Sequence, residues 1–527
     1  MTGAAHATFP PLEIAHWDLD MTDDRNDPEY LRINELVAEK KYDTAMSLIE
    51  KKILSSKDKS AALFLKGALL NEMGKYREAL TEFRKGYKIE ARHPAIQFSY
   101  CQIYRNLGDA ETSLRACKIA VHQHPQRPES HFEYAQTLQA MGNMKVANQE
   151  LETASKLDPK DPLYPFEQGK NYFYLNQLEE AENAFKKALA RDANHFDSAY
   201  QLAYLFAVKK EEDNSKTYLK RIMDSGKDHH KVKWAEDLMS IMRNNQLDKM
   251  PTTVTPYQYH LSHSQSLYKA GQYGLSLIET QTAARLKPGD KKIDQKILTT
   301  LVRMATLLLR LDLIEKTVQD LIKLAGEDRL LKASGYQELG DMSVMRGDLK
   351  LAKQYYEKAK VLGDPFDIAK ISLAELPKDL SNIKKGRLPD EYFIEPIKAW
   401  HKKGEIFDYY GMYDRAIAIY SEVLKMDPNH LMSKLNAAAA YYKKKEYEKT
   451  IALLERMLLS QPRHEFILEH HILLAKAYTK SGDPEAAIKN LERTKQLDPN
   501  AMTGILSDPT FEELKRHKFF NKLQQGG

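Results

Sequence analysis

Histidine-rich stretches are where this sequence comes closest to a catalytic motif. HEFILEHH, residues 464–471, nearly matches the helical HExxH pattern, in which two histidines hold zinc and the glutamate acts as a base. That pattern needs a histidine four residues after His464, where the chain has Leu468. The pair His122 and His124 lacks cysteine or carboxylate partners at ligand spacing. The sequence therefore predicts no metal site at either place.

Other residues that could carry chemistry are equally few. The chain has no glycine-rich loop of the GxGxxG or GxxxxGK[ST] type and no GxSxG nucleophile elbow. Its two cysteines, Cys101 and Cys117, are too few for a disulfide framework or a four-ligand zinc site. We therefore expect a protein that is not an enzyme and has no cofactor. The cysteines should be core residues in a reducing compartment.

Composition indicates a mixed, solvated surface. Charged residues make up 29% of the 527 residues and are interspersed, and the formal net charge is only +5. A nucleic-acid-binding stripe is therefore not expected. The first residues show no basic segment followed by an apolar core, and no window of 18 uninterrupted apolar residues occurs. We expect a cytoplasmic protein without membrane insertion, in which residues 1–25 form a flexible leader.

Small residues recur every 34 positions through the first half of the chain. This spacing predicts a repeated helical hairpin, because two antiparallel helices approach closely only where side chains are small. Turn-forming residues such as Gly74, Gly108 and Gly142 separate the two helices of each hairpin. The three columns of small residues are Ala45, Ala79, Ser113, Ala147, Ala181 and Ser215; Gly67, Cys101, Ala135, Gly169 and Ala203; and Gly86, Ala120, Ala154 and Ala188.

These columns resemble the tetratricopeptide repeat (TPR), a 34-residue helical hairpin with small residues, turn glycines and aromatic residues at fixed positions. The resemblance implies an all-α fold: a TPR solenoid in which antiparallel helix pairs form a right-handed superhelix, closed by a C-terminal capping helix. Residues 397–430 match the family pattern most completely, with Trp400, Gly404, Gly411, Tyr413, Ala416, Tyr420 and Pro428. The capping face is expected from Phe511, Leu514, Phe519 and Leu523.

The repeats and their interruptions predict seven segments. Because the period breaks at residues 230–256, we expect the main division of the chain there. The predicted segments are a flexible leader at 1–25, an N-terminal TPR array of six contiguous units at 26–229, an irregular helix and linker at 230–256, middle TPR-like units at 257–366, an irregular insertion at 367–396, a C-terminal TPR array at 397–501, and a capping helix and tail at 502–527.

The resemblance also implies a function. We expect a non-catalytic protein–protein interaction scaffold or adaptor that binds a peptide segment or partner domain in its concave TPR groove. The alternative is a regulatory subunit that controls an enzyme, such as a small GTPase or kinase, through its folded surface. In either case the expected partners are other proteins or peptide segments, with no nucleic acid and no small-molecule substrate.

Aromatic residues at position 5 of successive units predict where the groove lies. At about 100° per residue, positions 5, 9 and 12 of the first helix lie on the face that this family uses as its groove. The rings could hold a partner's side chains while polar neighbours bond its backbone. Alternatively, the rings merely pack between adjacent helices. The candidates are Tyr30, Phe64, Phe98, Phe132, Phe166 and Tyr200 at position 5, Asn34, Gln102, Gln136 and Lys170 at position 9, and Asn71, Arg105 and Gln139 at position 12.

Overall fold

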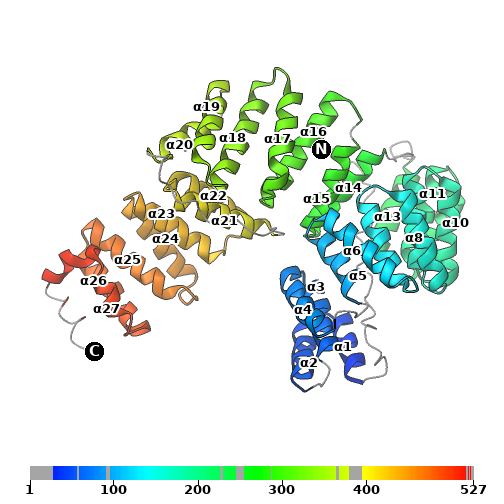
Figure 1. The fold of residues 1–527 in the computed structure, drawn as a ribbon, viewed down its shortest axis with the longest axis horizontal. Coiled ribbons are helices and arrows are strands. Elements are labelled where there is room, and N and C mark those ends of the chain that lie inside the picture. Colours follow the sequence, from blue (N-terminus) through cyan, green and yellow to red (C-terminus); the bar gives the residue numbers. More distant parts are fainter. Residues whose placement is uncertain are drawn as a thin grey trace. The chain divides into compact units, whose positions relative to one another are not determined.

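The chain folds into α-helical hairpins, shown by a computed structural model in Figure 1. No strand occurs among the described residues, and none of their helices is long and apolar enough to cross a membrane. Contacts divide the chain into two compact units, Met1–Ile297 (unit 1) and Leu298–Gly527 (unit 2). The predicted leader, residues 1–25, lies outside the described residues, which are 28–55, 59–90, 95–225, 229–244, 255–286, 288–363, 367–378, 395–517, 520 and 523.

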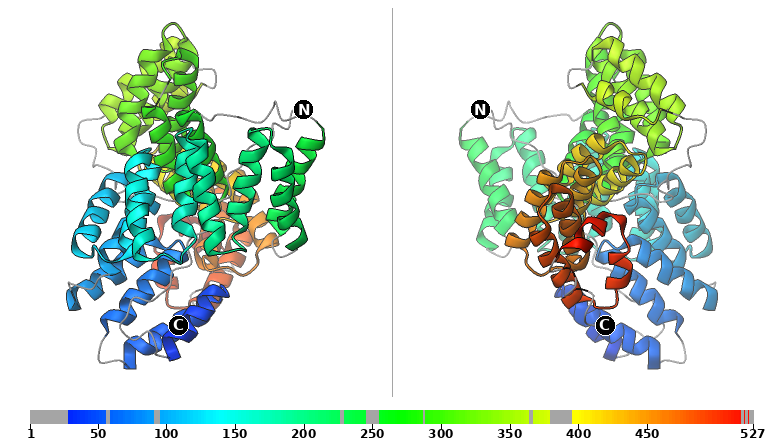
Figure 2. Two further views of the ribbon diagram at one scale, coloured as in Figure 1. Left: turned by 90° about the vertical axis from the view of Figure 1, so that its right-hand side faces the viewer. Right: turned by 90° about the vertical axis from the view of Figure 1, so that its left-hand side faces the viewer.

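Unit 1 begins with six consecutive helical hairpins, which Figure 2 shows from two further sides. In each hairpin the first helix packs on the second, and each hairpin packs on the next. The pairs are α1 (Pro28–Ala38) with α2 (Tyr42–Ser55), α3 (Ser60–Glu72) with α4 (Tyr76–Ile89), α5 (Ala95–Asn106) with α6 (Ala110–Gln123), α7 (Pro128–Ala140) with α8 (Met144–Leu157), α9 (Leu163–Tyr174) with α10 (Leu178–Arg191), and α11 (Phe196–Val208) with α12 (Glu212–Ser225).

Inside the hairpins, small residues of the sequence columns lie against large aromatic side chains of the facing helix. A Cβ atom added to Gly67 would lie 2.7 Å from the ring of Phe83, and one added to Gly169 would lie 2.5 Å from Phe185. Each ring thus occupies the space that a side chain on the facing helix would need. Gly74 has a φ of 72°, a left-handed conformation that suits glycine at the turn between the two helices.

Three more helices of unit 1 follow the six hairpins. After the sixth hairpin, where an irregular helix was expected, α13 (His229–Arg243) buries Leu238 and Met242 in the same core as α11 and α12. Helices α14 (Pro256–Lys269) and α15 (Tyr273–Arg285) form a hairpin, and α15 lies against α5 and α7. Because this hairpin packs on the N-terminal repeats, the contacts divide the chain inside α16, at Ile297, rather than at the expected 230–256. Residues 245–254 of the expected linker lie outside the described residues.

Unit 2 uses the same pairing of small and large residues. A Cβ atom on Gly340 or Gly404 would lie 2.4 Å from the ring of Tyr356 or Tyr420. The helices are α16 (Lys291–Leu307), α17 (Leu311–Ala325), α18 (Arg329–Met345), α19 (Leu349–Leu362), α20 (Ile368–Glu375), α21 (Pro396–Tyr409), α22 (Tyr413–Met426), α23 (Leu431–Lys443), α24 (Tyr447–Ser460), α25 (Ile467–Ser481) and α26 (Pro484–Leu497). Within the expected insertion at 367–396, α20 packs on α19 and α22, and residues 379–394 lie outside the described residues.

The C-terminal segment covers the last hairpin, as expected of a cap. It contains a short helix, α27 (Met502–Leu506), and a 3₁₀ helix, η2 (Pro509–Arg516). Phe511, Leu514, Phe520 and Leu523 are buried in one cluster with apolar residues of α25 and α26. The 3₁₀ segment therefore does the work that we assigned to a regular helix, and Phe519 lies outside the described residues.

A disulfide between Cys101 and Cys117 joins α5 to α6. Both residues are fully buried, which confirms that they are core residues. We expected them to stay unpaired, and the structure corrects this. Position 8 faces position 24 within each repeat, as Gly67 faces Phe83, so the two cysteine Cα atoms lie 4.9 Å apart, close enough for a disulfide.

Candidate functional site

A cavity in unit 1 lies between the first helices of four repeats and the α14–α15 hairpin. Its volume is about 1020 Å³, including the open space at its mouth. One wall comes from α3, α5, α7 and α9, and the other from α14 and α15. The structure thus brings seven predicted groove residues to one surface, where partner binding stays a prediction. They are Asn71, Gln102, Arg105, Phe132, Gln136, Gln139 and Lys170.

Most other aromatic candidates pack away from this surface. Phe64 is fully buried over Gly86, where an added Cβ atom would lie 2.5 Å from the ring. Phe166 is 6% exposed and belongs to the hydrophobic core of α9–α13. The half-buried Tyr200 lies with its ring centre 5.8 Å from that of Trp234. The rings of Phe64 and Phe166 thus pack between helices, as in the alternative to partner binding given above. The side chains of Tyr30, Asn34 and Phe98 lie outside the described residues.

Amide side chains from successive repeats meet on the cavity wall. Asn71 donates from Nδ2 to Oε1 of Gln102 at 2.6 Å, and Gln139 donates to Oδ1 of Asn171 at 2.9 Å. These bonds fix amides from neighbouring first helices along the wall. Gln136 differs, because its Nε2 has no hydrogen-bond partner among the described residues although the residue is only 8% exposed. A buried donor without an acceptor is costly, which makes this amide the open hydrogen-bonding position of the wall.

Charged residues of the same wall are unevenly matched. Arg105 lies 2.7 Å from Glu133, and Lys170 lies 2.8 Å from Glu167, so both cations are already paired. Glu72, the last residue of α3, forms no ion pair with a described residue. Burial, and then the nearby carboxylate of Glu133, raises the pKa of Glu72 to about 7. The wall therefore carries one more carboxylate than its own cations neutralise.

The α14–α15 hairpin is held against the repeats by close packing and hydrogen bonds. Thr282 donates from Oγ1 to the backbone oxygen of Ala140 at 2.8 Å. This carbonyl is the last of α7, and the last carbonyls of a helix have no hydrogen-bond partner within it. A Cβ atom on Gly274 would lie 2.0 Å from the backbone oxygen of Asn106. Only glycine fits at this point of α15. These contacts therefore fix the position of the second wall against the repeats.

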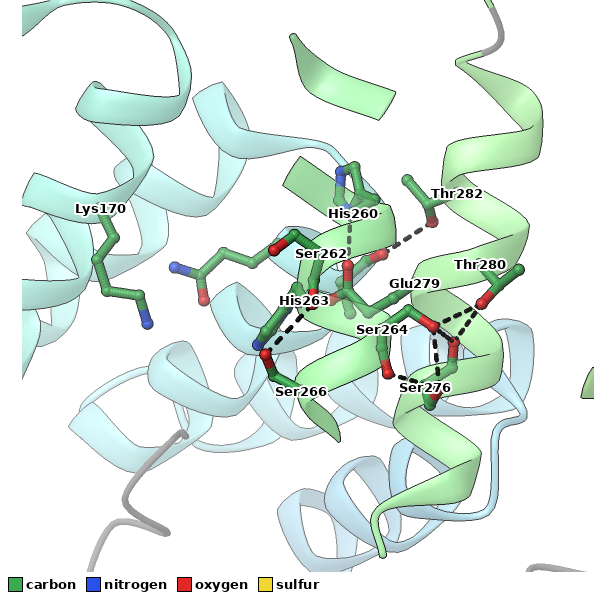
Figure 3. A network of polar contacts seen from close by, with 12 residues as sticks. Lys170, His260, Ser262, His263, Ser264, Ser266, Ser276, Glu279, Thr280 and Thr282 are labelled. Atoms are coloured by element: carbon green, nitrogen blue, oxygen red, sulfur yellow. Dashed lines mark hydrogen bonds and ion pairs between the residues drawn. The ribbon is translucent and has the colours of Figure 1, made fainter. Parts of the chain in front are cut away.

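A buried histidine–glutamate cluster stands on this second wall, and Figure 3 shows it with Lys170 on the facing side. Nδ1 of the fully buried His260 lies 2.5 Å from Glu279, and Nδ1 of His263 lies 3.1 Å from the other oxygen of the same carboxylate. Burial alone would raise the pKa of Glu279, but the two imidazoles outweigh it and lower the pKa to about 2. Among the described residues, no group of three or more histidine, cysteine, aspartate or glutamate side chains is arranged to hold a metal ion.

Sequence reasoning missed the acidic residues of the cavity and its whole second wall. Glu133 and Glu167 did leave a signal, since both occupy position 6 of their repeats, 34 residues apart on largely buried helices. His263 and Glu279 could not be placed, because nothing in the repeat pattern states which earlier helices a later hairpin contacts.

Unit 2 holds a second buried charge cluster, centred on Asp341 of α18. Arg415 of α22 donates from Nη2 to both carboxylate oxygens at 2.6 and 2.7 Å, and Nζ of Lys403 on α21 lies 2.6 Å from Oδ2. Tyr356 of α19 donates its hydroxyl at 2.8 Å. Burial alone would raise the pKa of Asp341, but Arg415 and then Lys403 lower it to about 2. The carboxylate thus ties four helices of unit 2 together.

Comparison with known proteins gives matches to one kind of repeat. Family models described as tetratricopeptide repeat match residues 166–224, 410–466 and 471–501, so matches fall in both units. No curated protein matches the chain significantly in sequence.

Several solved TPR structures are similar to this chain at low identity. TTC0263, a thermophilic TPR protein of Thermus thermophilus, is 20% identical over 33% of this chain and 96% of its own, with a TM-score of 0.31. YrrB, described as a TPR protein with an unusual peptide-binding site, is 18% identical over 36% of this chain and 97% of its own, with a TM-score of 0.29. The TPR domain of P58(IPK) is 15% identical over 76% of this chain and 99% of its own, with a TM-score of 0.21. Family models match in both units, and the 34-residue columns form the helical hairpins of this repeat. This chain is therefore a tetratricopeptide repeat protein.

Proposed function

We propose that this protein is a scaffold or adaptor that holds an extended segment of a partner protein in the cavity of unit 1. The TPR fold is generally a protein–protein interaction module, which supports a protein partner. The observation that carries the proposal is the open amide of Gln136, a buried donor on the cavity wall without an acceptor among the described residues. A peptide carbonyl is an acceptor that would satisfy it.

The rest of the wall suits an extended chain. Gln102 and Gln139 present amides on neighbouring first helices, and Phe132 offers a half-buried ring beside them. Alternating polar groups and apolar surface can hold a peptide's backbone and side chains at the same time.

Site-specific photo-crosslinking tests this proposal. The full chain would carry the photoreactive residue benzoylphenylalanine in place of Phe132, inside the cavity, or in place of Tyr87, an exposed aromatic residue of α4. Both replacements keep an aromatic ring, so the fold should survive in each. We expect a discrete protein adduct, identified by mass spectrometry, from the Phe132 variant alone.

The same experiment can contradict the proposal. If both variants give the same adducts, or if adducts form only from Tyr87, the partner contacts another surface. Gln136→Ala in the Phe132 crosslinking background provides a second check, because losing the open amide should reduce the yield of the adduct.

A further inference from the structure

We infer that the cavity selects a lysine or arginine residue of its partner, with the cationic group beside Glu72 and Glu133 and the residue's backbone carbonyl at Gln136. This inference rests on the proposed function and deepens it by naming the chemistry of the bound segment. Three features of the cavity lead to it: an uncompensated carboxylate, a second carboxylate beside it, and an unused amide donor.

The uncompensated carboxylate is Glu72. It is the last residue of α3, where the helix dipole disfavours a negative charge, so helix stability does not explain it. It lines the cavity, is partly buried and forms no ion pair with a described residue. A side chain that costs stability in its own helix and faces a cavity is better explained by a ligand.

Glu133 strengthens the attraction for a cation. It is 4% exposed and pairs with Arg105, yet its Oε2 makes no hydrogen bond of good geometry with a described residue. Glu133 also raises the pKa of Glu72, which shows that the two carboxylates repel each other when both are charged. Arg105 and the hydroxyl of Tyr76 are the other titratable groups that act here. A cation between the carboxylates would remove their repulsion.

The open amide of Gln136 favours a peptide over other cationic ligands. Its Nε2 needs an acceptor, which a metal ion or a polyamine lacks and a lysine or arginine residue carries in its backbone. An acidic segment is disfavoured, because it would meet Glu72 while the cations Arg105 and Lys170 are already paired. The excess negative charge of the wall and its open donor therefore both favour a peptide segment that contains lysine or arginine.

Capped pentapeptides test the inference on the full chain. The probes are acetyl-Ser-Gly-X-Gly-Ser-amide with X as lysine, arginine, norleucine or glutamate, titrated by calorimetry. Norleucine keeps the aliphatic stem of lysine without its charge. We expect the lysine and arginine peptides to bind about tenfold or more tightly than the norleucine peptide, the effect of one charge-assisted contact. The glutamate peptide should bind least.

Two variants locate the effect. Glu72→Gln should remove most of the preference for the cationic peptides and leave binding of the norleucine peptide unchanged. Glutamine has the shape of a protonated glutamate, and the variant should therefore fold. Glu78→Gln changes an exposed carboxylate of α4 in the same hairpin and should keep the full preference. Affinity for the lysine peptide should also rise between pH 6 and pH 8, as Glu72 ionises.

The inference is overturned if the lysine peptide binds no better than the norleucine peptide, including the case in which neither binds. It is also overturned if Glu72→Gln keeps the preference. These results leave the proposed function standing as long as crosslinking from position 132 still captures a partner. Loss of that crosslink together with an intact lysine preference would instead refute the proposed function alone.

Discussion

Two buried charge clusters, one in each unit, show opposite ways of placing carboxylates inside the same repeat architecture. Asp341 in unit 2 is surrounded by Arg415 and Lys403, which lower its pKa to about 2. In unit 1, burial and then the nearby carboxylate of Glu133 raise the pKa of Glu72 to about 7. The first carboxylate is compensated by its own chain, and the second is not.

This difference separates a structural role from a binding role. A buried anion with all its partners fixes the relative positions of the helices that supply them, here α18, α19, α21 and α22. A carboxylate that lines a cavity without a counter-charge contributes nothing comparable to the fold. Local violations of this kind are expected where a protein binds something else.

Breaking the compensated cluster should have the largest effect. Asp341→Asn would leave Arg415 and Lys403 buried without the carboxylate that both contact, which should lower the free energy of unfolding of unit 2 by roughly 3–5 kcal/mol. Hydrogen exchange read by mass spectrometry would report it, because α18 and α22 should lose protection while unit 1 keeps its own. The matched control is Glu357→Gln, an exposed carboxylate on α19. Equal protection in the two variants would show that the cluster is not structural.

Changing pH should distinguish the two clusters by the sign of its effect. The folded pKa of Glu72, about 7, exceeds the ordinary value of 4.5, so between these values the folded state holds a proton that the unfolded chain has released. The unfolding free energy of unit 1 should therefore fall as pH rises from about 4.5 to 7, by an amount on the order of 2–3 kcal/mol. Asp341 acts oppositely, because its contribution is present above its ordinary pKa of 3.8 and is lost as pH falls toward 2.

Urea unfolding across this pH range, followed by hydrogen exchange of unit 1, checks the prediction. Glu72→Gln should flatten the dependence and be more stable than the natural chain above pH 7, where the natural carboxylate is charged. Glu78→Gln should keep the original slope. An unchanged slope in Glu72→Gln would assign the effect to other groups.

Much of unit 1 followed from the sequence, because position within a repeat determines the side of the helix. The 34-residue columns predicted close helix packing at Gly67, which in the structure lies against Phe83. The groove positions predicted that Asn71 and Gln102 share one surface, where their amides bond each other. They left open whether Phe64 binds or packs, since the same position can face the groove or the neighbouring helix. In the structure the Phe64 ring is fully buried and lies over Gly86 of the facing helix.

The 34-residue repeat pattern could not predict contacts between elements that lie far apart in the sequence. Asp341 and Arg415 are 74 residues apart, with an irregular segment between them. Thr282 bonds Ala140 across 142 residues. Small and large residues within a repeat specify how it packs on the adjacent repeats. The long-range pairs depend instead on the path of the irregular segments, which the repeat pattern does not specify. Gly274, a glycine inside a helix, was the one local sign that α15 meets another backbone closely.

Filling the space at Gly274 should loosen the second wall of the cavity. In Gly274→Leu the added side chain would meet the backbone at Asn106, so the hairpin must move or the helices must strain, at a cost of roughly 1–3 kcal/mol. The higher helix propensity of leucine opposes this by about 1 kcal/mol. Faster hydrogen exchange confined to α14 and α15 would confirm it. The control is Ala270→Leu, at an exposed position of the same hairpin. If Gly274→Leu keeps native protection, α15 is not held against α5.

The smallest effect should come from removing one hydrogen bond of the same wall. Thr282→Val keeps the shape of the side chain and deletes the donor to the backbone oxygen of Ala140, which should cost roughly 0.5–1.5 kcal/mol. Thr153→Val, a half-buried threonine whose hydroxyl bonds to the backbone oxygen of Gln149 within α8, should cost less. The informative measurement is the double variant with Gly274→Leu. If both changes act by releasing α15 from the repeats, the second should add little to the first, whereas full additivity would mean that the two contacts hold the wall independently.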